Sequence, residues 1–535
     1  MTDFIIIGAG SSGCVLASEL SANPNHQVLV IESGPLDTSF LIEMPRGIGK
    51  LLSPDNEHVW SYDINKGKNL GQETWLKGRT LGGSSSVNGM VYARGFPSDY
   101  NRWETEWGCK GWNWKAMLPH FVAHEDHEFG ANEQRGIGGP LHITGHPVND
   151  TGRDAKELCE AFLDAAQQAG TPRVKDTNTA VDGGAGYQPR NIWQGRRQSA
   201  AKVFLHPAMS RPNLKVLTKT DVLRIIFEGK KAVGVEVRDE TGTRIIRCHK
   251  EVILSAGAIE SPKLLQLSGV GPSEKLLPLG IDVIHDLPQV GQNLREHYYV
   301  SVTFRVTKGS LNKEFQGLSL LKNMVRYMLK HKGPMANAAQ EIIGYIKTRE
   351  GLERPDCQIG AGLYTIGKGP KGPVLEKELG LTIGGYHMHP QSQGEMYITS
   401  NDPAVKPYIQ ANYLEHTEDK DASVALIRYI RKIAQQSAIS PYIVEELAPG
   451  IDIQDYDNLL HAYHELGSTA FHVSGTCRMG GDEYSVVDPQ TRVRGVQGVR
   501  VVDTSIFPEL ISGNTNAPAM AAGRHAAKMI LAAYS

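Results

Sequence analysis

The sequence has few cysteines, and their scattered positions argue against a disulfide-stabilised class of protein. Only six of the 535 residues are cysteine, and no two of them form a CxxC pair. Isolated cysteines in a chain of this length argue against a disulfide framework and are typical of a reducing compartment. The six residues are Cys14, Cys109, Cys159, Cys248, Cys357 and Cys477.

Long apolar and long basic runs are also absent. Without a run of about twenty apolar residues, the sequence predicts no membrane-spanning helix. The chain enters the apolar run Phe4–Ile7 almost at once, so no cleaved secretion signal is expected. We therefore expect a cytoplasmic protein, with peripheral membrane contact left open. The formal net charge of −2 and the lack of a basic footprint argue against nucleic acid as a partner.

What the chain does contain is an N-terminal strand–turn–helix–strand pattern. Phe4–Ile7 and Gln27–Ile31 are short apolar runs typical of buried parallel strands. Between them, residues 8–13 form a GxGxxG turn, and residues 14–20 have helical spacing. Glu32 ends the second strand at roughly the twenty-residue separation that the dinucleotide fingerprint requires.

This pattern has a physical basis in nucleotide binding. The free N–H groups at the start of a helix receive a pyrophosphate. A carboxylate at the tip of the second strand, here Glu32, accepts hydrogen bonds from ribose hydroxyls and repels a 2′-phosphate. The pattern predicts a dinucleotide site, but by itself it does not separate FAD from NAD.

A second glycine-rich segment runs from Gly78 through Asn88 to Gly95 and predicts a loop around a polar ligand. Glycine lets the backbone approach a ligand closely, while serine and asparagine add hydroxyl and amide partners. A flexible linker would lack the interleaved apolar residues seen here and would not lead directly into the structured run 89–92.

Strand signals recur in the middle and at the end of the chain. Residues 214–237 have a hairpin pattern, residues 250–258 form a strand followed by a helix near Ser261, and residues 499–503 precede a helix over 519–533. We predict an α/β fold with two domains. One is a Rossmann-type nucleotide domain assembled from residues 1–155, 190–300 and 456–535. The other is an α+β substrate domain with an antiparallel sheet, covering residues 156–189 and 301–455.

The substrate domain contains a predicted amphipathic basic helix over 311–332. Its apolar stripe consists of Leu318, Leu321, Met324 and Met328. We expect this stripe to pack on the domain, with the basic face in solvent, in preference to membrane contact. Residues 394–399 and 408–410 predict strands of the antiparallel sheet.

Five ordered motifs, spread over essentially the whole chain, resemble the signatures of the glucose–methanol–choline (GMC) oxidoreductases. They are the loop from Gly78 and the segments Gly257–Gly271, Val290–His297, Phe471–Gly480 and Gly513–Pro518. The resemblance implies FAD as the cofactor. It also implies that an alcohol loses its hydroxyl proton to a base and its α-hydrogen, as hydride, to flavin N5.

The resemblance implies a role for each matching residue along the cofactor. Gly8, Gly10, Ser12 and Gly13 would hold the pyrophosphate, Glu32 the adenosine ribose, and Val222 the adenine. Arg79, Gly83, Asn88 and Val91 would line the flavin. Asp503 and the turn containing Asn514, Ala517 and Pro518 would close its isoalloxazine end.

The same resemblance assigns the catalytic pair. His472 matches the catalytic histidine of the family, and Asn516 matches its partner position. An unperturbed histidine titrates near 6.5 and is therefore an available base at neutral pH. An asparagine amide can hold a substrate oxygen without taking its proton.

The predicted reaction is FAD-dependent oxidation of a primary alcohol, aliphatic, aromatic or polyether, to the aldehyde. A quinone, a redox protein or O2 would accept the electrons. An alcohol oxidase that releases H2O2 and a lyase of the hydroxynitrile type stay open as alternatives. Val87 stands where some members tether FAD to a histidine, so non-covalent FAD is expected.

The remaining histidines are weighed as metal or substrate ligands. His461 and His464 lie one helical turn apart but have no further ligand at the usual spacing, so no metal is expected. His387 and His389 alternate on a predicted strand, which leaves open whether they face the substrate.

Overall fold

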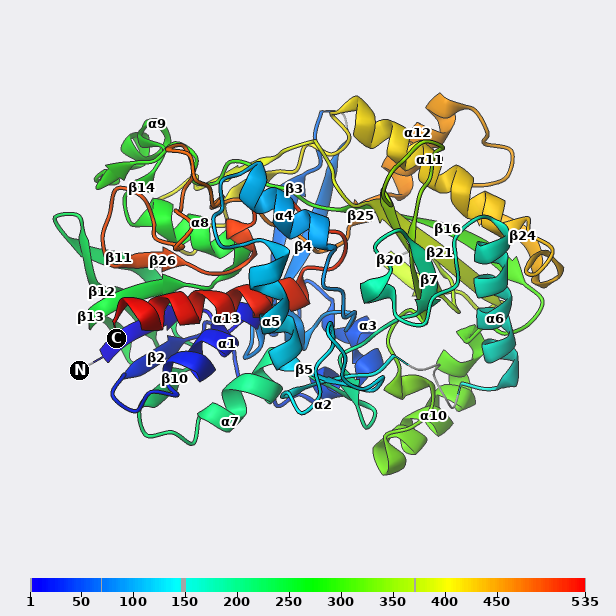
Figure 1. Ribbon diagram of the computed structural model, residues 1–535, viewed down its shortest axis with the longest axis horizontal. Helices are drawn as coiled ribbons and strands as arrows, with labels where there is room; N and C mark the ends of the chain where they lie inside the picture. The colour runs from blue at the N-terminus through cyan, green and yellow to red at the C-terminus, as the bar shows by residue number, and fades with distance from the viewer. Residues whose placement is uncertain (1, 69, 146–150, 370–371, 535) are drawn as a thin grey trace.

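The computed structural model describes residues 2–68, 70–145, 151–369 and 372–534 and contains two seven-stranded sheets (Figure 1). Helices cover both sheets, and the predicted α/β class with a discontinuous Rossmann-type domain is confirmed. The first sheet lies toward the end that carries both termini, and the second lies toward the opposite end (Figure 1).

The first sheet is mixed and combines strands from three distant parts of the chain. Its order is β10 (Leu214–Leu217), β2 (Val28–Ile31), β1 (Thr2–Ile7), β13 (Gly242–Leu254), β12 (Lys231–Asp239) and β11 (Asp221–Glu228), with β26 (Val499–Val501) on β13. The strands next to β1 run parallel to it, whereas β11 and β12 form an antiparallel extension. Phe4–Ile7 is fully buried because a central parallel strand is covered on both faces.

Helices α1 (Ser11–Leu20) and α13 (Asn516–Ala533) pack against each other beside this sheet (Figure 1). The carboxyl ends of its parallel strands meet at one edge. Gly8, Glu32, Ser255 and Asp503 follow β1, β2, β13 and β26 there. Open parallel sheets bind ligands in the crevice at this edge.

The second sheet is antiparallel, with one face buried and the other facing the main cavity, so side chains along a strand alternate between the two. Its order is β24 (Ile443–Ala448), β16 (Tyr298–Val306), β21 (Gly380–His387), β18 (Cys357–Gly362), β17 (Ile342–Ile346) and β7 (Gly184–Tyr187), with β25 (Ser468–Thr469) on β16. Along β16, Val300 and Val302 are buried, whereas Tyr299 and Ser301 line the main cavity. Helices α6 (Arg153–Gln168), α11 (Thr417–Ala434) and α12 (Tyr456–Leu466) contribute to the core on the buried side.

A four-stranded sheet joins the two parts of the molecule. It contains β22 (Glu395–Tyr397), β23 (Tyr408–Gln410), β3 (Val59–Asn65) and β4 (Gln72–Gly78). The domain ranges stay a prediction, and two observations bear on their limits. Strand β16 runs across residue 300, and β25, which follows α12, pairs with β16 in the second sheet.

Two helices begin earlier than the sequence indicates. Helix α8 spans Gly257–Leu267, so it starts ahead of Ser261. Helix α13 starts at Asn516, so Asn516, Ala517 and Pro518 form its first turn and are not a turn before it. Proline is tolerated there because the first-turn N–H groups have no intrahelical acceptor.

Helix α10 spans Gly317–Lys330 after a short 3₁₀ turn at Asn312–Phe315. Our expectation that its apolar stripe packs on the domain is wrong, because Leu318, Leu321 and Met328 are exposed and only Met324 packs inward. The helix is held from the other side. Tyr327 is buried there, and the Asn323 amide donates to the Glu314 carboxylate.

Candidate active site

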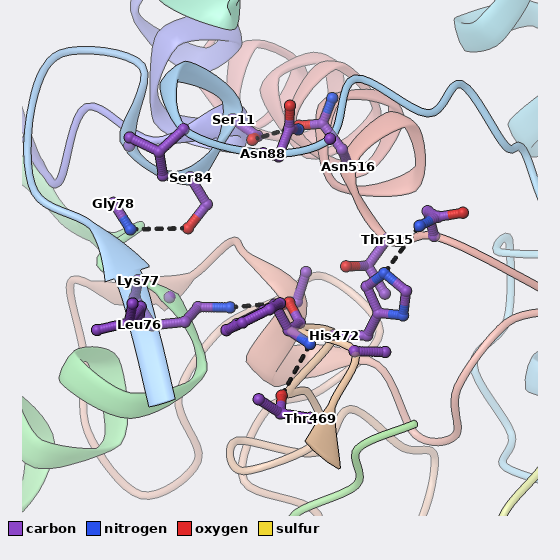
Figure 2. Close-up of a pocket in the computed structure, with 18 of the residues that line it drawn as sticks. Ser11, Leu76, Lys77, Gly78, Ser84, Asn88, Thr469, His472, Thr515 and Asn516 are labelled. Atoms are coloured by element: carbon purple, nitrogen blue, oxygen red, sulfur yellow. Dashed lines mark hydrogen bonds between the residues drawn. The ribbon is translucent and has the colours of Figure 1, made fainter. Parts of the chain in front are cut away.

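A cavity of about 660 Å³ lies where the first and second sheets approach each other. The carboxyl-end loops of the first sheet line one side of it, and residues of β16, β18 and β21 line the other. The glycine-rich loop that follows β4 forms a further wall (Figure 2). The cavity therefore joins a nucleotide-type crevice to a chamber on the second sheet.

Most of the residues predicted for the site contribute to this lining. They are Gly8, Gly10, Ser12, Glu32, Gly83, Asn88, Val91, Val222, His472, Asp503, Asn514 and Asn516. Gly13, Arg79, Ala517 and Pro518 do not line it. Gly13 has a packing role, because a Cβ there would lie 2.0 Å from the Gly8 carbonyl oxygen.

Arg79 does not line the cavity, although its neighbour Gly78 does. Its guanidinium stacks over the Trp60 ring at 4.3 Å and lies 3.7 Å from the Asp221 carboxylate. A Cβ on Gly34 would lie 2.2 Å from the Arg79 backbone, so these two chain segments pack directly together. These contacts give Arg79 a structural position outside the cavity.

The nucleotide end is built from backbone groups and one carboxylate. The Glu32 carboxylate accepts hydrogen bonds from Ala9 N–H and Gly34 N–H, both at 2.9 Å. Burial raises the pKa of Glu32, and the two amides oppose that rise by stabilising its charge. Helix α1 has no side-chain cap at Gly10, so its first N–H groups are left for an anion.

The loop walls leave the space that a flavin dinucleotide needs. Gly89 and Gly257 line the cavity, and a Cβ on either would meet no atom within 4 Å. A Cβ on Gly83 would lie only 2.8 Å from the Cα of Gly10, so the loop packs backbone to backbone on the first turn. Gly78 N–H donates to the Ser84 hydroxyl at 3.1 Å, which fixes the base of the loop (Figure 2). This cradle fits FAD.

At the far end of the cavity, His472 belongs to a directed chain of hydrogen bonds. His297 Nε2 lies 2.8 Å from the Met388 carbonyl oxygen, which can only accept, so His297 donates from Nε2. Burial lowers the pKa of His297 to about 3, so its other ring nitrogen carries no proton. His297 Nδ1 therefore accepts from His472 Nδ1–H at 2.9 Å. This contact leaves His472 Nε2 unprotonated, with its lone pair available to a donor.

The chain continues on the other side of His472. Asn514 Nδ2 donates to His472 Nε2 at 2.9 Å, and Asn514 Oδ1 accepts from Gln358 Nε2 at 3.3 Å. Gln358 Oε1 and the Tyr386 hydroxyl are buried cavity atoms without a hydrogen-bond partner in the described ranges. Polar atoms in that state are ready partners for a hydroxyl-bearing ligand.

The electrostatics keep His472 neutral. Burial, reinforced by His297 and Lys77, lowers the pKa of His472 well below its ordinary value of 6.5. Beneath it, the Glu296 carboxylate accepts from the His472 backbone N–H at 2.8 Å, and burial raises the pKa of Glu296 to about 7. A neutral imidazole with an unprotonated Nε2 is a competent general base.

The loop that presents His472 is held by short-range contacts. Phe471 has φ +65°, a left-handed conformation that is uncommon for a residue other than glycine. Its N–H donates to the Thr469 hydroxyl, and its carbonyl accepts from Lys77 Nζ at 3.2 Å (Figure 2). Such a backbone persists only where its surroundings hold it in place.

The structure places Asn514 in hydrogen-bond contact with His472, while Asn516 lines the same cavity without touching that imidazole. Asn516 Oδ1 accepts from the Ser11 hydroxyl at 2.7 Å, which joins the starts of α13 and α1 (Figure 2). His297, Gln358 and Tyr386 were not assigned from the sequence. His297 does lie in one of the five motifs, but its contact with His472 spans 175 residues and has no local signature.

The other histidines lie outside the main cavity lining. His387 faces the Asp419 carboxylate at 3.4 Å, and His389 lies 3.1 Å from the Ser512 hydroxyl. Within the described ranges, no group of three or more His, Cys, Asp or Glu residues could hold a metal ion.

The fold and the cavity together define a dinucleotide-dependent oxidoreductase. The chain belongs to the GMC oxidoreductase family, whose N-terminal model matches residues 2–299 and whose C-terminal model matches residues 390–523. It is an FAD-dependent enzyme, and FAD-dependent alcohol oxidation is its general chemistry.

Relatives and solved structures agree with this assignment. The chain is 38% identical to mitochondrial choline dehydrogenase of Mus musculus, over 98% of this chain and 89% of that protein. It is 36% identical to oxygen-dependent choline dehydrogenase of Brucella suis biovar 1, over 99% of this chain and 95% of that protein. Pyridoxine 4-oxidase from Mesorbium loti superposes with a TM-score of 0.89 at 28% identity, over 99% of both chains. Formate oxidase superposes with a TM-score of 0.90 at 25% identity, over 100% of this chain and 98% of that chain.

Proposed function

We propose that this enzyme oxidises a neutral primary alcohol, aliphatic, aromatic or polyether, to the aldehyde and passes the electrons to an acceptor other than NAD. The observation that carries the proposal is the directed hydrogen-bond chain through His472. Because His297 accepts from Nδ1–H, the Nε2 lone pair is held at the cavity. A base in that position can take a hydroxyl proton.

The residues around this base have separate roles in the proposal. FAD, when bound, supplies the acceptor for the hydride that leaves the alcohol carbon. His472 Nε2 takes the hydroxyl proton, and His297 keeps the imidazole in the tautomer that can do so. Asn514 Nδ2 donates to the same nitrogen in this structure, and when an alcohol binds that donor can move to the alcohol oxygen, where negative charge develops. Asn514 thereby takes over the partner role first predicted for Asn516.

The chemistry of the substrate end supports a neutral alcohol. Going outward from His472, the cavity presents Tyr386, Tyr299 and Gln340, in contact with one another. The carboxylates among the described lining residues are Glu32, Glu260 and Asp503, and all three are hydrogen-bonded to protein groups. A quaternary ammonium group would favour an aromatic face beside a carboxylate, and the substrate end offers only the aromatic part.

The electron acceptor divides the proposal into two forms. A quinone or a redox protein would make the enzyme a dehydrogenase, and O2 would make it an oxidase that releases H2O2. The similar proteins include both a choline dehydrogenase and oxidases, which supports keeping both forms. The proposal includes a cytoplasmic location with peripheral membrane contact.

An anaerobic screen of alcohols, followed by the loss of flavin absorbance, tests the proposal. We expect neutral primary alcohols to bleach the flavin and choline to do so poorly. Repeating the active pairs in air, with peroxide release measured against dye reduction, separates an oxidase from a dehydrogenase. A flavin that no alcohol bleaches would refute alcohol oxidation and would favour the lyase alternative.

The link between the protein and FAD gives a separate prediction. Val87 lines the cavity within a small apolar cluster that includes Ile42 and Val59, and its side chain has no atom that could bond to the flavin. Acid or SDS denaturation is therefore expected to release all of the FAD into the supernatant. The measurement is flavin absorbance after filtration, and yellow colour retained by the polypeptide would contradict the prediction.

A further inference from the structure

The outer face of α10 is an unusual surface for a protein in water. Five apolar side chains on this helix are between 48% and 85% exposed: Leu318, Leu321, Val325, Met328 and Leu329. With about 3.6 residues per turn, they occupy one face roughly 100° wide. We call these five residues the α10 apolar face. It points away from Asn323 and Tyr327, through which the helix is attached.

Basic residues flank this face on one side. Lys322, Arg326 and Lys330 follow each other at intervals of four residues, which places them along one line of the helix. Four Lys or Arg residues and no Asp or Glu lie between Glu314 and Glu341. The combination of an exposed apolar face and a basic flank is typical of helices that lie in a membrane interface.

A groove beside α10 extends the basic surface. It has a volume of about 890 Å³, and its lining includes Lys322, Lys330, His331 and Lys332, with Glu128 as the one acidic side chain among its described residues. Helix α10 projects at the edge of the molecule, away from the first sheet (Figure 1). The groove therefore opens where an anionic headgroup could reach it.

Two exposed aromatic side chains stand close to this surface. The Phe40 ring is 42% exposed and lies 5.7 Å from the Tyr327 ring of α10. Trp193 is 41% exposed and lies next to Gln194, a residue of the basic groove. Aromatic side chains are favoured at the level of lipid headgroups, where their rings span apolar and polar surroundings.

We propose that the α10 apolar face and its basic flank dock this enzyme on the surface of an anionic lipid bilayer. The helix has 14 residues, about 21 Å at 1.5 Å per residue, and therefore lies in the interface and does not cross a bilayer core of about 30 Å. Among the described helices, none is long and apolar enough to span a membrane. A second copy of the chain would oppose the same basic residues without acidic partners, which disfavours self-association.

Docking would bring one side of the cavity close to the lipid. The Phe315 ring, just ahead of α10, lies 6.3 Å from the ring of Tyr364, which lines the cavity. Arg46 stacks on both rings, at 4.9 and 5.2 Å. Apolar alcohols and quinones partition into lipid, so this placement would concentrate them near the cavity. Docking gives a surface to the peripheral membrane contact included in the proposed function, and it is independent of the proposed reaction because it needs no alcohol.

Vesicle flotation with the FAD-loaded enzyme tests the proposal without substrate. We expect the enzyme to float with vesicles of phosphatidylcholine and phosphatidylglycerol and to bind about tenfold less to phosphatidylcholine alone. The double variant Leu318→Gln/Leu329→Gln is expected to lose about tenfold or more in binding. Lys322→Gln/Lys330→Gln should lose about tenfold on anionic vesicles only.

A control substitution far from α10 tests whether a loss of vesicle binding is specific to the α10 apolar face. Leu277→Gln removes a leucine that is 63% exposed beside α9 (Ser273–Leu276), at the opposite end of the molecule (Figure 1), and should bind like wild type. FAD content and flavin bleaching by an alcohol should be unchanged in every variant, and Leu321→Gln/Met328→Gln replaces any variant that fails to fold. Equal binding by wild type and the α10 variants overturns the proposal. The proposal is also overturned if the wild type forms a dimer that does not bind vesicles and the α10 substitutions dissociate that dimer.

Discussion

His472→Ala is expected to bind FAD normally and to lose about 10²- to 10⁴-fold in the rate of flavin reduction by an alcohol. The loss follows from geometry, since the contact with His297 keeps His472 Nε2 unprotonated at the cavity, beside the Asn514 amide. FAD binding should survive, because the nucleotide end rests on the turn at Gly8–Gly10 and on Glu32. Anaerobic stopped-flow absorbance measures the rate, and the flavin spectrum reports loading.

The pH dependence of the wild-type rate tests the same role. Burial lowers the pKa of His472 well below 6.5, and only the neutral imidazole can take a proton. The rate should therefore stay level as the pH falls through 6.5 and should decline only at more acidic values, where His472 becomes protonated. A decline centred at or above 6.5 would contradict the lowered pKa.

Two asparagine variants provide the matched comparison. Asn514→Ala removes the amide that contacts His472, whereas Asn516→Ala removes one that contacts Ser11. We expect the first to slow flavin reduction by about tenfold or more, as the loss of a donor to developing charge implies. The second should act mainly on FAD affinity. A near-normal rate in His472→Ala, or a larger kinetic effect of Asn516→Ala, would remove these assignments.

His297→Leu is expected to lose roughly a hundredfold in flavin reduction, although His297 touches neither substrate nor flavin in this account. Its Nδ1 is the acceptor that holds the proton of His472 on Nδ1. Without that acceptor, the buried His472 Nδ1–H has no partner, and the imidazole gains by moving its proton to Nε2. The base would then present an N–H where a lone pair is needed. His297 is thus a positioning residue.

His297→Gln is the conservative counterpart. It keeps one acceptor and one donor and should recover part of the rate, whereas a packing defect would not distinguish the two variants. The ¹⁵N chemical shifts of His472 give a readout independent of the rate, since they report which ring nitrogen is protonated. A leucine variant with wild-type rate and an unchanged His472 tautomer would refute the positioning role.

The local pattern was enough to predict the nucleotide half of the fold. Phe4–Ile7, the GxGxxG turn and Glu32 lie within one strand–helix–strand unit, so their spacing alone places them at a crevice. The structure confirms the strands, and β11 and β12 form the predicted hairpin, whereas β10 at 214–217 pairs in parallel with β2. Helix limits differ only by a few residues. The apolar stripe of α10 is the larger error, because periodicity reports an amphipathic helix without reporting which face meets the protein.

In the candidate site, too, the sequence could predict features that depend on a local motif but not contacts between distant segments. His472 was predicted because its motif is local, and it lies in the cavity. Asn514 and Asn516 lie only two residues apart, but α13 begins at Asn516, so Asn514 lies ahead of the helix and Asn516 in its first turn. Their side chains therefore point in different directions, and the role of each depends on where the helix begins. Arg79 was expected at the flavin but stacks on Trp60, a contact that loop sequence cannot specify.

The amino-acid sequence by itself determined the family and the cofactor and placed the proposed base, His472, in a recognisable motif, because each depends on short segments whose spacing has a direct physical meaning. Only the tertiary structure decided that His297 holds the tautomer of His472, that Asn514 is its partner, and that the α10 apolar face is left in solvent. These facts depend on contacts between segments far apart in the chain, where burial and hydrogen-bond direction are set by packing and not by local pattern.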